Sequence, residues 1–476
     1  MGNSSCTTSI HILDDDSLLH VFALYRPFLL DNGRGDEALL WGGKGLCVRG
    51  RWWYKLAHVC QRWRNVILGS ASYLDISLVC THGTPVADML AHSPPLPLAI
   101  DYVKKVTDIT AKCEEGIILA LRQRDRVRGV RLQMPVTNLQ RLIAAMDEGY
   151  PILEYLHIML PIEDNSTILT FPEILQAPHL RHLRLKGFAL PIRSRLLTTS
   201  VGLVTLYLDM AHSSTYFHPN TLLRWISLMP QLEALTVYFF IPNRDVERQL
   251  MHTLIIAPIT LPNLHRFHFR GVSAYLEALV HQIATPCLKK LEIDFFNQLT
   301  FSVPRLLQFI NLTEDFKFDS AVFKFFGSEV SVRVFPLVEA EMHAYVITVV
   351  CRHLDWQVSS IAQIFNSLSQ VFSAVEHLTL VHGVHRRSSE EHNKVDRTEW
   401  RELFRPFSNV KTLLVDDELI EELSQYLQLE DEELPLEVLP ELQELAYSRR
   451  GKIGDAFTAF IDARRNAGRP ITLFRR

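Results

Sequence analysis

The sequence lacks the features that mark membrane, secreted and disulfide-stabilised proteins. Only seven of its 476 residues are cysteine, and no two of them form a Cys-x-x-Cys pair. An odd number of scattered cysteines is typical of reduced thiols in the cytosol or nucleus. No apolar run approaches the length of a membrane span, and the N-terminus has no signal-peptide core. We therefore expect a cytoplasmic or nuclear protein that does not contact a membrane.

Motifs for catalysis are also missing. We find no phosphate-binding loop, no Gly-x-Ser-x-Gly, no dinucleotide fingerprint and no His-Glu-x-x-His. The pairs His179 and His182, and His265 and His268, have no acidic or cysteine ligands at metal spacing beside them. The sequence thus predicts no catalytic residue, no metal site and no cofactor. We expect a protein that is not an enzyme, with a pocket of unrecognised catalytic residues as an alternative.

The charge pattern gives no signature of nucleic-acid binding. The formal net charge is -4, and 21% of the residues are charged, which is ordinary for a globular protein. We see no basic stripe interleaved with aromatic residues, so DNA or RNA is not an expected partner.

Two helical patterns are present near the N-terminus. Asp14 to Asp16 offer N-cap oxygens and negative charge where a helix begins. In that first helix the apolar residues recur at i, i+4 and i+7, as Leu18, Phe22 and Tyr25. A second helix has its apolar residues on one stripe with 4, 3, 4, 3 spacing, namely Trp52, Leu56, Val59, Trp63 and Val66. The pair must pack on each other, on the rest of the chain or on a partner.

The chain divides into four predicted parts. Residues 1–10 are expected to be a disordered leader, and residues 11–75 a helical module with a Gly-rich insertion at about 31–50. Residues 76–125 connect the two larger parts through a strand over Leu74 to Leu78, a helix over Pro85 to Ala91, and a second strand. Residues 126–476 form the remaining domain, closed by a helix over Asp455 to Ala467 and a last strand from Ile471 to Phe474.

Residues 126–476 contain an internal repeat. An apolar residue is followed by others three and five positions later, and this triad recurs about every 23 to 35 residues, near the leucine-rich-repeat range. The triads are Val127-Val130-Leu132, Leu153-Leu156-Ile158, Leu180-Leu183-Leu185, Leu203-Leu206-Leu208, Leu232-Leu235-Val237, Leu264-Phe267-Phe269, Leu288-Leu291-Ile293, Val375-Leu378-Leu380, Val410-Leu413-Val415 and Leu442-Leu445-Tyr447. The pattern predicts short buried strands, each stacked on its neighbour.

The predicted fold class is α/β, a small helical module followed by an irregular leucine-rich-repeat-like solenoid. Its parallel sheet should be curved, with helices on the outer face, such as Leu222 to Met229 and Tyr275 to Ile283. The asparagine that regular repeats place after the strand is absent. Between Asn311 and Cys351 the segments Asp315 to Phe318, Ser331 to Phe335 and Tyr345 to Val350 alternate instead like paired strands.

The N-terminal segments Leu13 to Phe22 and Leu56 to Arg64 resemble an F-box, the module that docks a receptor onto the Skp adaptor of cullin-RING ubiquitin ligases. The family usually has Leu-Pro where this chain has Leu13-Asp14, and a shorter link between the helices. The resemblance implies a set of adaptor-binding residues: Leu13, Leu18, Leu19, Phe22, Leu56, Val59 and Trp63. Gly83-Thr84-Pro85-Val86, Leu180-Arg181-His182-Leu183 and Phe460-Ile461-Asp462-Ala463-Arg464 extend the likeness to an expanded F-box family of mushroom-forming fungi.

The resemblance implies a receptor subunit that holds a target protein for ubiquitin transfer by other subunits. Its partners would be the Skp-type adaptor, a cullin-RING ligase reached through it, and an unknown target. We expect target contacts at outward strand positions, because solenoids usually bind there. These are Arg184, Tyr207, Thr236, His268 and Glu292, with Phe239 and Phe240 on a rim. The alternative is a ligase-independent scaffold or recognition protein whose F-box is only structural.

Overall fold

The computed structural model describes most of the chain. The described residues are 13–25, 46–103, 109–146, 148–160, 168–210, 215–239, 258–296, 298, 300–313, 318–336, 344–383, 395, 397–427, 438–447 and 457–475. The chain divides into two compact units, Met1–Tyr207 and Leu208–Arg476, with the boundary inside one strand. The leader, most of the Gly-rich insertion and residues 315–317 lie outside the described residues.

The first unit begins with three helices, α1 (Asp15–Tyr25), α3 (Leu46–Ala57) and α4 (Gln61–Gly69). The Asp14 carboxylate caps α1, because its Oδ1 accepts the backbone N–H of Ser17 at 2.7 Å. This hydrogen bond lowers the pKa of Asp14. Leu18 and Phe22 are buried, and the Phe22 ring meets the Trp63 ring edge-on with centroids 4.9 Å apart.

The second predicted helix is two helices in the structure. The helix α3 ends at Ala57, and Cys60 has extended backbone (φ -158°) and starts α4 by accepting the N–H of Trp63 with its sulfur at 3.5 Å. Arg64 Nε closes the end of α3 by donating to the Ala57 carbonyl at 3.1 Å. These side chains bond to backbone groups at the end of α3 and the start of α4. The chain therefore turns between the two helices, although the apolar stripe of the sequence continues across the turn. The insertion is also shorter than predicted, since α3 already begins at Leu46.

The rest of the first unit is a sheet with strand order β1-β2-β3-β4-β6-β8, and all its assigned pairs are parallel. Its strands are β1 (Leu78–Cys80), β2 (Leu98–Val103), β3 (Val127–Gln133), β4 (Tyr155–Met159), β6 (His182–Lys186) and β8 (Thr205–Met210). Its helices are α5 (Val86–His92), α6 (Ala111–Leu121), α7 (Val136–Ala144) and α8 (Arg195–Thr199). The short strands β5 (Leu169–Thr170) and β7 (Phe188–Ala189) form a separate parallel pair.

The second unit continues the same alternation, with strand order β9-β11-β13-β16-β15-β14-β17-β18-β19-β20. Its strands are β9 (Ala234–Phe239), β11 (Arg266–Gly271), β13 (Lys290–Phe296), β14 (Ser320–Phe325), β15 (Val330–Phe335), β16 (Ala344–Val350), β17 (His377–His382), β18 (Thr412–Val415), β19 (Glu444–Tyr447) and β20 (Thr472–Arg475). A further parallel pair is β10 (Ile259–Thr260) with β12 (Ile283–Ala284).

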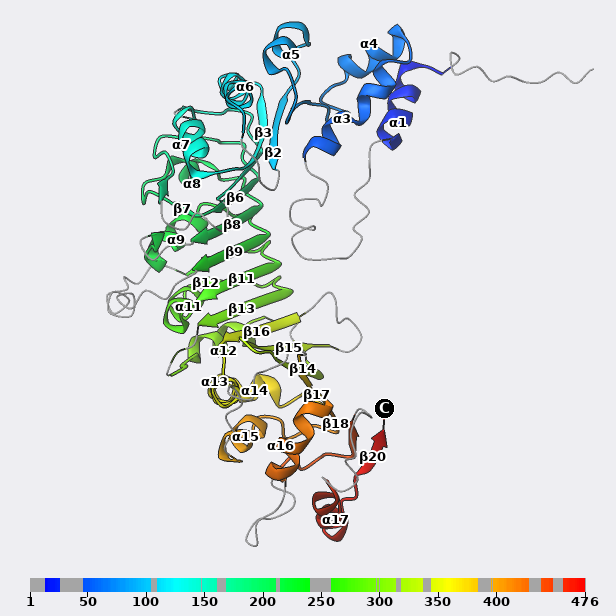
Figure 1. Cartoon of the computed structure of the whole chain (residues 1–476), viewed down its shortest axis with the longest axis vertical. Coiled ribbons are helices and arrows are strands. Elements are labelled where there is room, and N and C mark those ends of the chain that lie inside the picture. Colours follow the sequence, from blue (N-terminus) through cyan, green and yellow to red (C-terminus); the bar gives the residue numbers. More distant parts are fainter. Residues whose placement is uncertain are drawn as a thin grey trace, which may run out of the picture. The chain divides into compact units, whose positions relative to one another are not determined.

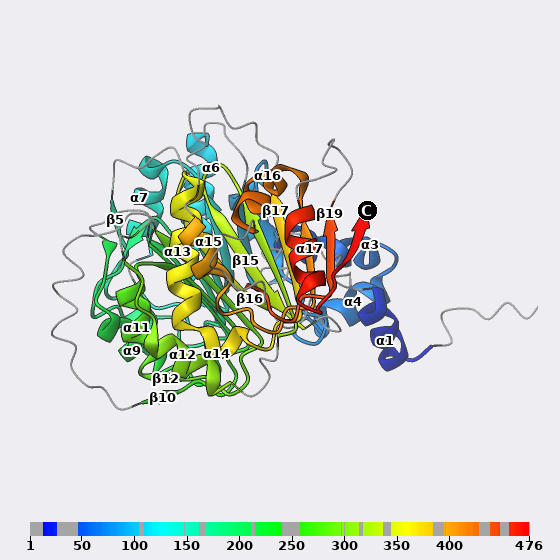
Figure 2. The ribbon, with the colours of Figure 1, turned by 90° about the horizontal axis from the view of Figure 1, so that it is seen from below.

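The helices of the second unit are α9 (Pro219–Ile226), α11 (Ser273–Val280), α12 (Pro304–Asn311), α13 (Leu354–Ser367), α14 (Ser369–Phe372), α15 (Arg397–Phe404), α16 (Asp417–Leu427) and α17 (Thr458–Asn466). In Figure 1, α9, α11 and α12 lie on one side of β9, β11 and β13. Figure 2 shows α13 and α15 side by side next to β15 and β16. One face of the sheet is therefore covered by helices, as the solenoid pattern predicts.

All ten predicted triads are buried, and each ends in a strand of the sheet. The first triad residue closes a turn in most repeats; for example, the N–H of Leu180 donates to the carbonyl of Ala177, and that of Leu264 to the carbonyl of Leu261. The next two residues point from the strand into the core. Because a single strand cannot bury both, each repeat depends on its neighbours. The solenoid prediction is confirmed.

The break in the repeat near Asn311 is a reversed strand. β15 pairs antiparallel with both β16 and β14, whereas β16 is parallel to β13 and β14 is parallel to β17. The expected pairing of the segments ending at Phe335 and Val350 is confirmed. Most of the strand predicted over Asp315 to Phe318 lies outside the described residues; the described strand β14 begins at Ser320.

Two other predicted boundaries are corrected. Leu74 and Ile76 are buried but lie in a turn, where Asp75 has a φ of 54° and its carboxylate pairs with Arg128. The strand β1 therefore starts at Leu78. The helix predicted to end at Ile283 stops at Val280, because Ile283 joins the short strand β12.

Arg464 holds the last helix to the preceding repeat. Its side chain is fully buried, and the guanidinium donates to the carbonyls of Leu439, Pro440 and Leu442 at 3.0 to 3.2 Å. These carbonyls belong to the turn before β19. The guanidinium of one residue on α17 thus provides hydrogen-bond donors for three backbone carbonyls of the preceding turn.

We predict that Arg464→Met lowers the free energy of unfolding by about 2 to 4 kcal/mol, because buried carbonyls lose their charged donor. Urea unfolding monitored by circular dichroism checks this. The matched control is Arg465→Met, since Arg465 is exposed and pairs with the exposed Asp462 one turn away; its effect should stay below about 0.5 kcal/mol. Equal effects of the two substitutions would contradict the stabilising role of the hydrogen bonds from Arg464 to these carbonyls.

Candidate functional site

The face of the sheet opposite the triads carries the candidate target-binding residues. Side chains alternate along a strand, so residues between the buried triad members point away from the helices. We call this side the open face. The register places His268 beside both Thr236 and Glu292, and Arg270 beside both Tyr238 and Asp294.

His268 is the centre of a hydrogen-bonded network on the open face of the second unit. Its Nδ1 lies 2.8 Å from Glu292 Oε2 and 2.6 Å from the Tyr238 hydroxyl, and its Nε2 lies 3.4 Å from Asp294 Oδ2. Lys290 Nζ contacts the other oxygen of Glu292 at 2.7 Å. The side chains of His268 and Glu292 are only 24% and 18% exposed, so their interaction is partly shielded from water.

The network favours the charged forms of both central groups. Burial lowers the pKa of His268, but its hydrogen bonds to Asp294 and Glu292 outweigh burial and raise the pKa from 6.5 to about 9. Burial raises the pKa of Glu292, but hydrogen bonding to His268 and the charge of Lys290 lower it from 4.5 to about 2. At neutral pH the site is therefore a cation held between two carboxylates.

In the first unit the open face carries a row of basic side chains. Arg131, His157 and Arg184 occupy matching positions on β3, β4 and β6. The Arg184 guanidinium lies 4.2 Å from the centroid of the Tyr207 ring, a cation–π contact. Burial, then the charges of Arg184 and Arg131, lower the pKa of His157 to about 3, so this ring is neutral. Arg184 and Tyr207 are both buried, at 6% and 8% exposure.

The predicted target-binding residues do not form one surface patch. His268 and Glu292 are in direct contact, and Thr236 lies beside them but is buried. Phe239 is a correction: it is 1% exposed and packs in the core against Tyr216, Phe217 and Tyr275. It cannot form a rim, and Phe240 lies outside the described residues. Asp294 and Tyr238 were missed, although strand alternation from Glu292 and Thr236 points to both.

The predicted adaptor-binding residues differ in their exposure. Leu18 and Phe22 are buried inside the helical module, and Leu19, Leu56 and Trp63 are half-buried. Leu13 and Val59 are exposed, at 38% and 58%. The residues that build the module are thus largely distinct from those that a partner can touch.

The exposed apolar surface of α1 was missed by the sequence pattern. Val21, Leu24 and Tyr25 are 44%, 71% and 59% exposed, and their spacing of i, i+3 and i+4 places them on one side of the helix. Tyr73 is also exposed, and its hydroxyl contacts His20 of α1 at 3.4 Å. We call Val21, Leu24, Tyr25 and Tyr73 the α1 patch.

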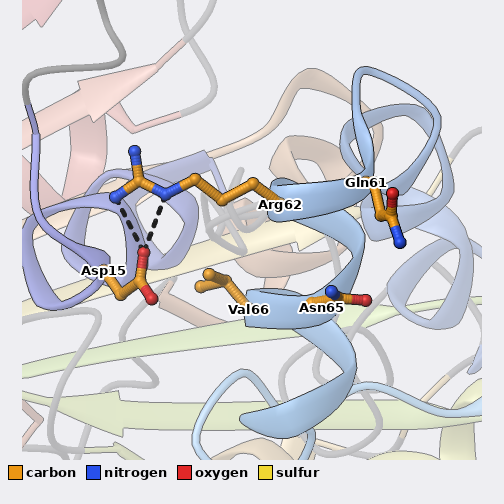
Figure 3. Close-up of a pocket in the computed structure, with 5 residues that line it drawn as sticks. All are labelled: Asp15, Gln61, Arg62, Asn65 and Val66. Carbon is orange, nitrogen blue, oxygen red and sulfur yellow. Dashed lines mark hydrogen bonds and ion pairs between the residues drawn. The ribbon is translucent and has the colours of Figure 1, made fainter.

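A shallow pocket lies between α1 and α4 (Figure 3). It measures about 460 Å³ and is lined by Asp15, Gln61, Arg62, Asn65 and Val66. Arg62 reaches across to Asp15, with Nη2 to Oδ1 at 2.8 Å, and also donates to the Leu13 carbonyl at 2.6 Å. This links the two helices, but an exposed ion pair contributes little to stability.

Within the described ranges, no three His, Cys, Asp or Glu side chains are grouped so that they could hold a metal ion. In the same residues, no helix is long and apolar enough to cross a membrane.

No family model and no curated protein matches the chain. Among solved structures, one similarity is to the TLR13–ssRNA13 complex, with 11% identity over 83% of this chain and 48% of the other, and a TM-score of 0.32. Another is to the leucine-rich-repeat-containing protein LegL7 from Legionella pneumophila, with 11% identity over 83% of this chain and 99% of the other, and a TM-score of 0.26. The chain spans about half of the first structure.

The chain has a leucine-rich-repeat-type α/β fold. The assignment comes from the strand order, the parallel register and the ten buried triads. Folds of this type are scaffolds for recognition between proteins.

The His268 network predicts a pH-dependent stability. Because folding raises the pKa of His268 from 6.5 to about 9, its stabilisation is full below pH 6.5 and is lost as the pH rises through 9. We expect wild-type protein to lose on the order of 1 to 3 kcal/mol of unfolding free energy across that window. In His268→Gln this loss should disappear, as urea unfolding at several pH values would show. The matched control is His281→Gln, because His281 is exposed. The prediction is refuted if the free energy of unfolding of His268→Gln falls with pH in parallel with that of the wild type.

Proposed function

We propose that this chain is the substrate-receptor subunit of a Skp-cullin-F-box type ubiquitin ligase. The N-terminal helices would bind the Skp-type adaptor, and the repeat domain would bind a target protein. Support comes from the F-box resemblance of Leu13 to Phe22 and Leu56 to Arg64, and from the repeat fold that follows. Such a receptor works in the cytosol or nucleus and needs no chemistry of its own, since it raises the local concentration of a target near the ubiquitin donor.

The observation that carries the proposal is the α1 patch. Leu24 is 71% exposed although it lies in a helix whose other apolar face is buried. Exposed apolar side chains gathered on one helix face mark protein interaction sites more often than scattered ones do. The patch lies on the same helix as the buried residues Leu18 and Phe22. A partner that binds the patch therefore depends on the packing of the helical module.

The replacement of proline by Asp14 is compatible with this role. The family proline fixes the start of the first helix through its restricted φ. Asp14 performs the same local task by another means, since its carboxylate caps the Ser17 amide. The apolar ring is lost, however, so a partner finds a charged residue beside Leu13.

One observation favours the alternative, a module that is only a structural cap. Trp52 and Trp53 of α3 are buried, and Trp53 Nε1 donates to the carbonyl of Ser77 at 3.3 Å, just before β1. The helix α3 thus packs on the first strands and shields the end of the sheet. Capping uses α3, whereas the α1 patch lies on another helix, so the two roles can be separated by mutation.

The proposal predicts that Val21→Glu with Leu24→Glu abolishes capture of a purified Skp adaptor. The change puts two charges on an apolar contact surface while leaving the buried residues intact. In a pull-down, we expect binding to fall about tenfold or more, equivalent to about 1.4 kcal/mol or more. Changing Leu18 and Phe22 instead would be uninformative, because both are buried and their loss would disrupt the module.

The matched control is Ile192→Glu. Ile192 is 68% exposed, close to the 71% of Leu24, but belongs to the repeat region. It should capture adaptor like the wild type. If the wild type captures no adaptor, the ligase role is wrong and the capping alternative stands.

A further inference from the structure

The open face changes in character along the second unit. On β11 and β13 it carries charged groups, with Glu292 and Asp294 in contact with His268. From β14 to β20, by contrast, one row of register partners across the strands has no charged side chain. The row takes one residue from each of β14, β17, β18, β19 and β20, namely Val322, Thr379, Leu414, Ala446 and Phe474. We call it the uncharged row.

The uncharged row points away from the helices and is partly accessible. Leu414 stands between Leu413 and Val415, which are buried in the core, so strand alternation turns it to the open face. Leu414 and Val322 are half-buried, and Phe474 at the end of the row is 45% exposed. Apolar side chains that gather on a surface bordered by polar residues mark sites of contact with another protein.

Opposite charges border the row at its two sides. Lys324 lies on β14 two residues after Val322, and Glu444 lies on β19 two residues before Ala446, so both also project from the open face. Both side chains are exposed. Within the residues that the structure describes, neither is in an ion pair, and Glu444 Oε2 accepts a long hydrogen bond from the Thr412 hydroxyl at 3.5 Å.

Neighbouring charges have the same sign on each side. Arg333 of β15 adds positive charge next to β14, and its guanidinium already lies 5.3 Å from the centroid of the Phe335 ring. Asp416, just after β18, adds negative charge on the other side, and its carboxylate accepts the backbone N–H of His382 at 3.2 Å. The uncharged row thus lies between a positive side at β14 and a negative side at β18 and β19.

We propose that this surface binds an extended segment of the target protein, with apolar residues over the uncharged row and opposite charges at its two ends. The inference rests on the proposed function, because it assigns a chemistry to the target. A carboxylate of the segment contacts Lys324, and a cationic side chain contacts Glu444. Charge complementarity selects this occupant, since a segment with two acidic ends, or a chain of phosphates, would meet the like charges of Glu444 and Asp416.

The dimensions fit a short extended segment. Three inter-strand steps separate β14 from β19 through β17 and β18, and Lys324 and Glu444 are four residues apart along the strands. These offsets amount to about 14 Å and about 13 Å, which gives a diagonal of about 20 Å. An extended chain rises about 3.3 Å per residue, so seven residues in a row span about this distance. The diagonal passes over Thr379 and Leu414, in the middle of the uncharged row.

A single chain fits this surface better than a second copy of the protein. Lys324 and Glu444 have longer side chains than Val322, Thr379 and Leu414, so the middle of the row is recessed between them. An extended segment can lie between the projecting groups. The open face of another copy would present the same projecting groups, which would hold the two sheets apart.

The test uses the full chain and a labelled, C-terminally amidated peptide of sequence Glu-Ser-Val-Ser-Leu-Ser-Lys. When extended, this peptide has its charged and apolar residues on one side. Fluorescence anisotropy measures its affinity. We expect Glu444→Lys to weaken binding about tenfold or more, because the lysine of the peptide then meets a like charge. The same variant should bind a second peptide, with Glu in place of that lysine, about tenfold more tightly than the wild type does. A gain of this kind cannot come from misfolding.

The matched control is Glu233→Lys, which makes the same change at an exposed residue just before β9, outside the uncharged row. It should bind both peptides like the wild type. The apolar contact is tested by Leu414→Ser, which should weaken binding of the first peptide about fivefold or more. Its control is Leu312→Ser, because Leu312 is 73% exposed and follows α12, away from the open face.

Any of three results would overturn the inference: no binding of the first peptide by the wild type, an equal loss in Glu233→Lys, or no gain for the second peptide in Glu444→Lys. Light scattering on the same samples tests the other occupant. A dimer that Leu414→Ser dissociates, in a protein that binds neither peptide, would assign the row to a contact between copies.

The assay contains no adaptor, so its failure can be told apart from failure of the proposed function. Peptide binding without adaptor capture would refute the ligase role and leave the binding surface in place. Adaptor capture without peptide binding would refute the surface alone.

Discussion

The register of most repeats depends on one recurring backbone interaction at the entrance of the strand. The carbonyl of a residue just before one strand accepts two consecutive N–H groups of the next repeat, as Glu154 does for Arg181 and His182, and Lys411 for Gln443 and Glu444. A slip by one residue would turn every buried leucine toward the open face. The hydrogen bonds and the hydrophobic core therefore favour the same register, and this agreement lets irregular repeats of unequal length stack in one order.

This constraint also determines where function can lie. The triads occupy the covered face, so the open face is relieved of core packing and can carry charge. In the second unit it carries His268 between Glu292 and Asp294, and further cations on both sides of this network. In the first unit, His157 and Arg184 of the basic row are buried and Arg131 is partly exposed, and the α1 patch is an exposed apolar surface of the helical module. Under the proposed function, adaptor docking and target recognition would use different kinds of surface, one apolar and helical, the other built on strands with charged side chains.

The sequence was sufficient to predict the repeat fold, because the triads report a strict requirement of burial that local context cannot override. It also predicted the cap at Asp14. It failed where tertiary contacts decide. The helix breaks at Cys60 because side chains cap the backbone there, although the apolar stripe in the sequence continues without interruption. At the turn, Asp75 pairs with Arg128, which lies far along the chain. For the site, strand alternation identified His268 and Glu292. It misplaced Phe239 on a rim, although alternation from Leu235 and Val237 puts Phe239 on the covered face of β9. It also placed Tyr25 on the apolar stripe with Leu18 and Phe22, whereas Tyr25 is 59% exposed.

Hydrogen–deuterium exchange of the full chain, with and without purified Skp adaptor, tests the central claim most directly, because it locates the contact without any substitution. The account predicts that the adaptor slows exchange in peptides covering Asp15–Tyr25, with exchange in β9, β11 and β13 unchanged. Slower exchange in those strands instead, or no change anywhere in the chain, would contradict the assignment of docking to the N-terminal helices.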